Sequence, residues 1–142
     1  MSNFSAFMKK NKAVKPNTHY AATKSLTDEE GNPLDWEIRA ITTRESNSIR
    51  ESCTREVPVP GKFGVYRQKV DRDYIDKITA AAIVYPNLYD KELQDSYGVS
   101  TPEDLLKEMV DNPAEYSELV RFVQEYSGYD VGMPDIVEEA KN

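Results

Sequence analysis

The strongest constraint on the fold is a run of three helix patterns with clear boundaries in residues 71–110. The first pattern opens with Asp71 and Asp73, because acidic side chains favour the positive end of a helix. It stops at Pro86, since proline disfavours helical geometry in the residue before it. Its apolar residues recur at the three- and four-residue spacing of one helix face, and they are Ile75, Ile78, Ala82 and Tyr85. This stretch predicts a helix over 71–85 with one buried face.

Two shorter helix patterns complete the same stretch. Tyr89, Leu93 and Tyr97 lie four residues apart, and Gly98 follows where a left-handed C-terminal cap belongs. The segment TPED at 101–104 then combines a capping hydroxyl, a proline at the first helical position and acids in the first turn. Together the three patterns predict the core of a helical protein.

Helix start signals also occur on both sides of this stretch. Thr42 and Glu45 have the spacing of a capping box, and the helix that they begin is predicted to end before Pro58. Asn112, followed by a proline, is a second start signal and predicts a last helix over 113–127. The chain is therefore predicted to hold four or five helices.

An alternating pattern near the N-terminus predicts a β-hairpin. Residues 34–41 place Leu34, Trp36, Ile38 and Ala40 on one face and charged residues on the other. Residues 20–26 are predicted to form the antiparallel partner strand, and the polar segment 27–33 to form the turn. Residues 58–69 are predicted to be a loop, with a third short strand near 63–67. The predicted fold is α+β and mostly helical, a single domain with the hairpin packed on the helices.

Charge is distributed unevenly along the chain, whose formal net charge is −7. Residues 1–24 contain five lysines and no acidic residue, whereas residues 90–142 contain fourteen acidic and four basic residues. We predict a flexible N-terminal arm over 1–18, a single α+β domain over 19–130 and a mobile acidic tail over 131–142. The acidic half would repel phosphate backbones, so nucleic acid is not an expected partner. No apolar run approaches the roughly 20 residues that span a bilayer, so no membrane is expected either.

Patterns for catalysis and metal binding are sparse. His19 and Cys53 are the single histidine and cysteine, so no zinc-ligand spacing exists, and no phosphate-binding glycine loop is present. We predict that His19 lies on an edge strand beside a loop and that Cys53 is a small core residue. Asp71, Asp104 and Glu115 stand at helix starts and are attributed to capping. The sequence predicts no enzyme, no cofactor and no metal site; a small hydrolase using converging carboxylates is the remaining enzymatic alternative.

The helical stretch also carries a family resemblance. YPNLYDKELQDSYGV at 85–99, followed by TPEDLLKEMV at 101–110, resembles the XkdN-like family of phage tail assembly chaperones. The similarity extends upstream through GNPLDWEIRAI at 31–41 and downstream from Glu115 to about residue 130, in the family's order and spacing. The resemblance implies a non-enzymatic assembly factor of a long-tailed phage or prophage. Such factors bind the tape measure protein in the host cytoplasm, keep it soluble while tail tube subunits polymerise around it, and are absent from the finished tail.

The sequence leaves two points about function open. The first is whether the chain is an assembly chaperone or a structural tail or adaptor component that is retained in the virion. The second is the set of partners, because the tail tube protein and a second copy of the chain are candidates beside the tape measure protein.

The predicted contact surface is the helical half of the chain. Tyrosines outnumber phenylalanines nine to four, and tyrosine suits surfaces that are both apolar and wet. A tyrosine can equally cover the edge of the core while its hydroxyl reaches water. The candidate contact residues are Tyr89, Tyr97, Leu88, Leu105, Met109 and Tyr116. Tyr89 and Tyr97 are the predicted anchors, since they are expected to be partly exposed.

Overall fold

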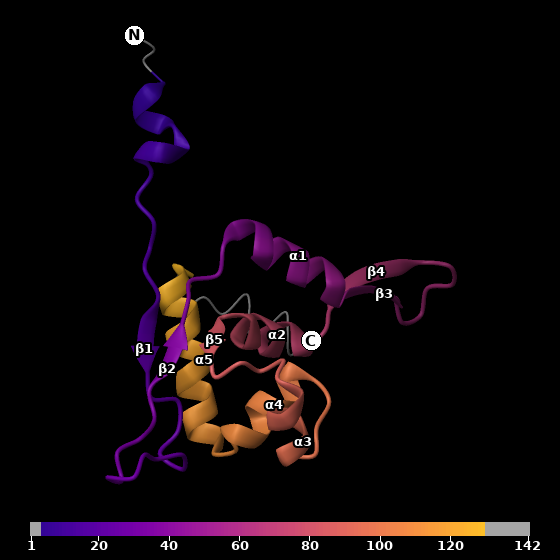
Figure 1. The fold of residues 1–142 in the computed structure, drawn as a ribbon. Helices are drawn as coiled ribbons and strands as arrows, with labels where there is room; N and C mark the ends of the chain where they lie inside the picture. The colour runs from indigo at the N-terminus through magenta and orange to yellow at the C-terminus, as the bar shows by residue number, and fades with distance from the viewer. Residues whose placement is uncertain (1–3, 130–142) are drawn as a thin grey trace.

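A three-stranded antiparallel sheet lies beside five α-helices in the computed structural model, which describes residues 4–129 (Figure 1). The sheet has the order β1-β2-β5, with β1 at Thr18–Tyr20, β2 at Trp36–Ile38 and β5 at Ile83–Tyr85. The helices are α1 (Thr43–Cys53), α2 (Asp73–Ala81), α3 (Lys91–Ser96), α4 (Pro102–Met109) and α5 (Pro113–Ser127). The predicted α+β class, with an N-terminal hairpin packed on helices, is confirmed.

The predicted N-terminal hairpin exists, but its first strand is earlier than expected. His19 pairs with Glu37 and Tyr20 with Trp36 in the antiparallel ladder. Residues 21–26 were predicted to belong to this strand, but Thr23 in this segment is held by α5 instead. Its hydroxyl donates to Glu115 Oε1 at 2.7 Å, and in the predicted pairing of this segment Leu26 still accepts a hydrogen bond from the Leu34 amide, at 2.9 Å.

The helix predicted over 71–85 divides into α2 and the third strand, β5. The last residues, Ile83, Val84 and Tyr85, are β-branched or aromatic and so favour a strand. Ile83 pairs with Ile38, and the Arg39 amide donates to the Ala82 carbonyl at 2.9 Å. The sequence had not predicted a strand at this place. Tyr85 is also exposed, although the helical pattern had placed it on the buried face.

A second hairpin occupies much of the predicted loop over 58–69, and its second strand overlaps the short strand that was predicted near 63–67. Helix α1 ends at Cys53, and β3 (Thr54–Pro58) pairs antiparallel with β4 (Tyr66–Val70). This two-stranded ribbon protrudes from the helical body (Figure 1). Phe63, near its tip, is fully exposed.

The predicted starts of α1, α4 and α5 and the predicted end of α5 are confirmed, because the local cap chemistry fixes them. Thr42 and Glu45 form the capping box of α1, Thr101 caps α4, and the Asn112 side chain caps α5. Gly128 closes α5 in the left-handed conformation, with φ at 93°, where a side chain would be strained.

The hydrophobic core joins the sheet to the helices. Helix α2 contacts α1, α4 and α5, so it lies at the centre of the helical layer. The largest fully buried apolar side chains come from the sheet and from these helices and their connections: Trp36, Ile38, Tyr74, Leu88, Leu105, Leu106, Leu119, Val110 and Val123. Cys53 is also buried, as predicted.

The N-terminal arm projects away from the body as two turns of 3-10 helix, Ser5–Phe7 and Lys9–Asn11 (Figure 1). Phe7 is exposed, so the arm buries little apolar surface of its own. The root of the arm is held on α5, because the Lys15 ammonium lies 4.1 Å from the centre of the Tyr126 ring and bonds to the Tyr126 carbonyl. The flexibility predicted for the arm stays a prediction, and the predicted tail over 131–142 lies outside the described residues.

Trp36→Ala should lower the free energy of unfolding by about 3–5 kcal/mol, because it removes a fully buried ring and leaves a cavity at the centre of the sheet. Urea denaturation followed by circular dichroism measures this change. Phe63→Ala is the matched control and should stay within about 0.5 kcal/mol of the unmodified chain, since that ring is fully exposed. Equal stability of the two variants would contradict the assignment of Trp36 to the core.

Candidate partner-binding surface

The segment 84–89, between β5 and α3, exposes a group of large apolar side chains. Val84, Tyr85 and Tyr89 are 39%, 65% and 73% exposed. Leu88, between them, is buried and fixes the segment to the core. The Tyr89 amide donates to Asn87 Oδ1 at 3.0 Å, which holds the turn into α3. The backbone is thus anchored while two tyrosine rings face solvent, an arrangement suited to contact with another protein.

The predicted contact residues divide into exposed, half-buried and buried groups. Tyr89 is exposed, as predicted. Leu88, Leu105 and Met109 are 1%, 0% and 6% exposed, so they belong to the core and do not reach a partner in this structure. Tyr97 is half-buried and packs against the core. The helical spacing identified an apolar face correctly, but it could not tell a face that packs inward from one that binds a partner.

Tyr116, the remaining predicted contact residue, joins three helices. Its hydroxyl donates to Asp76 Oδ1 at 2.5 Å, and Lys107 Nζ lies 2.6 Å from Asp76 Oδ2. Burial raises the pKa of the Tyr116 hydroxyl, and the hydrogen bond to Asp76 and its charge raise it further. This contact links α5 to α2 and α4 and gives Tyr116 a structural role.

Two of the acidic residues attributed to capping have other partners. The Glu115 carboxylate accepts bonds from the Thr23 hydroxyl and from the Lys24 amide, at 2.7 and 2.8 Å. These bonds lower the pKa of Glu115. Asp71 pairs with Arg55 Nε at 2.7 Å. Both carboxylates therefore tie distant segments together, which sequence spacing alone could not reveal.

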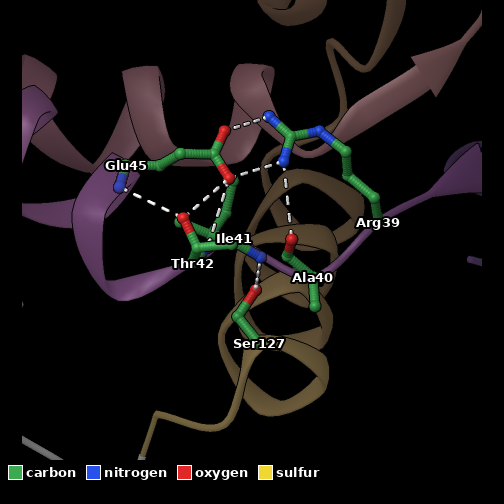
Figure 2. A network of polar contacts seen from close by, with 6 residues as sticks. All are labelled: Arg39, Ala40, Ile41, Thr42, Glu45 and Ser127. Carbon is green, nitrogen blue, oxygen red and sulfur yellow. Dashed lines mark hydrogen bonds and ion pairs between the residues drawn. The ribbon is translucent and has the colours of Figure 1, made fainter. Parts of the chain in front are cut away.

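A polar network joins the end of β2 to the start of α1 and the end of α5 (Figure 2). Arg39 makes two bonds to the Glu45 carboxylate, at 2.8 and 2.5 Å. The Ile41 amide donates to Ser127 Oγ at 2.9 Å. The hydrogen bond from Arg39 is the main reason why the pKa of Glu45 falls from 4.5 to about 2; burial opposes this effect, and the Thr42 amide adds to it.

A pocket of about 400 Å³ lies next to this network, between α1 and the end of α5. Ile41 and Tyr74 are nearly fully buried and contribute apolar surface to its wall. Ser46 and Asn47 contribute polar groups from α1, and Tyr129 closes the side toward the end of α5. No sequence pattern had predicted this pocket, because its lining comes from three separate segments of the chain, 41–50, Tyr74 and 127–129.

The residues considered for catalysis or metal binding lie apart. His19 is exposed on β1, which is an edge strand as predicted. Burial raises the pKa of the Cys53 thiol, the opposite of what activates a nucleophile. Within residues 4–129, no group of three or more histidine, cysteine or acidic side chains is placed to hold a metal ion. Among the helices of the same range, none combines the length and the apolar character needed to cross a membrane.

The fold and the exposed 84–89 segment define a small α+β protein with a surface suited to protein–protein contact. A family model described as phage XkdN-like tail assembly chaperone protein matches residues 4–141. The chain therefore belongs to this family of phage tail assembly chaperones.

Two relatives and one solved structure are similar to the chain. The uncharacterized protein YqbN of Bacillus subtilis (strain 168) is 30% identical over 120 residues, which is 84% of this chain and 80% of YqbN. The phage-like element PBSX protein XkdN of the same strain is 26% identical over 120 residues, which is 84% of this chain and 80% of XkdN. The crystal structure of YqbN superposes with a TM-score of 0.72 at 21% identity, covering 92% of this chain and 99% of that one. This superposition shows that the two chains share a fold.

Glu45→Gln should lower the free energy of unfolding by about 1 kcal/mol at pH 7, because a partly exposed charged pair with Arg39 is lost. The pKa of Glu45 is depressed in the folded chain, so its contribution is present above its ordinary pKa of 4.5 and is lost as the pH falls toward about 2. Urea denaturation across this range measures the difference between the two chains, which should shrink toward zero in acid.

Glu29→Gln is the matched control for this series, since Glu29 is exposed in the turn of the first hairpin. It should leave stability unchanged at every pH. A difference between Glu45→Gln and the unmodified chain that stays constant down to about pH 2 would contradict the role given to the carboxylate charge.

Proposed function

We propose that this chain binds the tape measure protein of its own phage in the host cytoplasm and keeps it soluble, without catalysis, while tail tube subunits assemble around it. The observation that carries the proposal is membership of the tail assembly chaperone family over nearly the whole chain. Such an assembly factor leaves before the tail is complete, so we expect it to be absent from the mature virion.

The chemistry of the helical half supports a helical partner with apolar and basic residues. Residues 90–129 contain ten acidic side chains and only three basic ones. The exposed tyrosines of the 84–89 segment precede this acidic region directly. An amphipathic helix commonly binds through a row of apolar anchors, and opposite charge accelerates the encounter. The same negative charge keeps the free chaperone soluble.

Tyr89 is the best-supported anchor of the proposed contact. Its ring is exposed and its backbone is fixed by Asn87 and by buried Leu88, so little conformational freedom is lost on binding. Tyr97 is a weaker candidate, because it packs against the core and a charge placed there would also disturb folding.

Tyr89→Asp should therefore abolish solubilisation of the tape measure protein when the two proteins are co-expressed. Hot-spot anchors contribute about 2 kcal/mol or more, which weakens binding by roughly 30-fold. The measurement is the soluble fraction of the tape measure protein and its co-purification with the chaperone. Tyr66→Asp is the matched control, since Tyr66 is 60% exposed on β4, away from the acidic helices.

The outcomes of this experiment separate the site from the function. If the unmodified chain neither binds nor solubilises its tape measure protein, the proposed function is wrong. If Tyr66→Asp abolishes binding and Tyr89→Asp does not, the function stands and the contact lies on the β3–β4 hairpin. Both variants should keep the melting temperature of the unmodified chain within a few degrees, because both side chains are exposed.

The second candidate, a structural tail or adaptor component, requires the same kind of surface but a permanent contact. Mass spectrometry of purified phage particles distinguishes the two. We expect no peptide of this chain in mature particles, and its presence at a fixed ratio to tail proteins would favour the structural component.

A further inference from the structure

The β3–β4 hairpin receives little support from the rest of the described chain. Its strands, of five residues each, pack mainly on each other, and the ribbon protrudes from the helical body (Figure 1). Phe63 and Val65, near the turn, are exposed. A two-stranded hairpin on its own is at best marginally stable in water, so this one stands to gain stability from contact with another molecule.

The pairing register gathers basic side chains on one face of the hairpin. Arg55 lies opposite Lys69, and Val57 lies opposite Arg67 two positions further along the ladder. Because residues two apart in a strand share a face, these four side chains lie on the same face, called here the basic face. Glu56, the one acidic residue of the two strands, lies on the opposite face.

The positive charge of the basic face is balanced only in part. Arg55 Nε pairs with Asp71 Oδ1 at 2.7 Å. Within residues 4–129, neither Arg67 nor Lys69 forms an ion pair. Like charges directly opposite each other in a ladder, as Arg55 and Lys69 are, repel and weaken the pairing. An acidic surface placed against this face would offset the repulsion.

Helix α4 carries such an acidic surface. Asp104 and Glu108 are exposed, and four residues of helical spacing put them on one face, called here the acidic face of α4. Lys107 does not neutralise them, because its ammonium lies 2.6 Å from Asp76 Oδ2. In the part of the chain that the structure describes, neither Asp104 nor Glu108 forms an ion pair.

Within one copy the basic face and the acidic face do not meet. The hairpin extends away from the body beyond the end of α1, whereas α4 packs on α2 inside the body (Figure 1). Two hairpins pairing edge to edge would bring like charges together, since both copies carry the same basic residues. The acidic face of a second copy is therefore the better match for the basic face.

We propose that the basic face of the hairpin in one copy binds the acidic face of α4 in a second copy. Two reciprocal contacts of this kind close a dimer, and unreciprocated contacts extend a row of copies. The association is weak and reversible, because the ribbon offers a small surface. Only copies of this chain take part, so the contact goes beyond the proposed function and does not depend on the tape measure protein.

Sedimentation velocity of the purified chain alone tests the proposal. At about 0.1 M salt the mean sedimentation coefficient should rise with protein concentration. At about 1 M salt the rise should be largely lost, because the screening length falls from about 10 Å to about 3 Å. A monomer at every concentration, or an association that salt does not change, would overturn the proposal.

Charge reversal on either face should weaken the association. The hairpin variant combines Arg67→Glu with Lys69→Glu, and the α4 variant combines Asp104→Lys with Glu108→Lys. Each variant alone should raise the dissociation constant by roughly tenfold or more, since like charges then meet at the contact. An equal mixture of the two variants should associate again, because each reversed face finds an oppositely charged one. Failure of the mixture to associate would overturn the pairing of these two faces.

Matched reversals elsewhere control for a general effect of charge. Lys10→Glu with Lys12→Glu, and Glu29→Lys with Glu30→Lys, change exposed residues outside both faces and should leave the association unchanged. Circular dichroism melting checks the fold of every variant. If the α4 double variant melts early, Glu108→Lys replaces it, since a lysine in the last turn suits the helix dipole.

A binding assay with a duplex DNA probe separates the proposed partner from a nucleic acid. The unmodified chain should not bind the probe, because its net charge is −7. If the hairpin variant loses binding to the probe but keeps its self-association, the basic face serves a nucleic acid and the proposal is overturned.

Discussion

Burial of strand β2 is the interaction on which the rest of the structure depends. Trp36 and Ile38, the first and last residues of β2, are 2% and 0% exposed. The strand pairs with β1 along one edge and with β5 along the other. Two short strands could not hold a sheet alone, because an isolated hairpin is at best marginally stable in water. The third strand and the helices supply the missing contacts. The end of β2 leads directly into the network of Arg39 and Glu45, which sets the start of α1 against the end of α5 (Figure 2).

The sequence predicted those parts of the fold that local chemistry determines. Thr42, Thr101 and Asn112 have cap functions that involve only residues two or three positions away, so spacing was enough to find them. Alternation in 34–41 likewise predicted the burial of Trp36, since the period of a strand fixes which side chains share a face. The α+β class followed from these local signals taken together.

Long-range contacts account for what could not be predicted. Tyr85 fits the apolar spacing of a helix, but pairing with Glu37 makes it part of a strand. Glu115 stands at a helix start, yet it bonds to residues about ninety positions earlier. For the candidate site, the sequence found the exposed Tyr89 but also proposed Leu88, Leu105 and Met109, which are buried. One apolar stripe can face a core or a partner, and only the position of neighbouring elements decides between them.

The way in which exposed apolar groups are held bears on how a protein with such groups avoids aggregation. Two of these groups are attached to the body by a specific contact nearby. Leu88 anchors the 84–89 segment in the core, and the root of the N-terminal arm is held on Tyr126. Large continuous apolar patches promote association without selectivity, whereas separate anchored groups on an acidic body expose little area at any one place. Because buried Leu88 fixes the backbone of the 84–89 segment, the exposed rings of that segment can be contacted without ordering a loop.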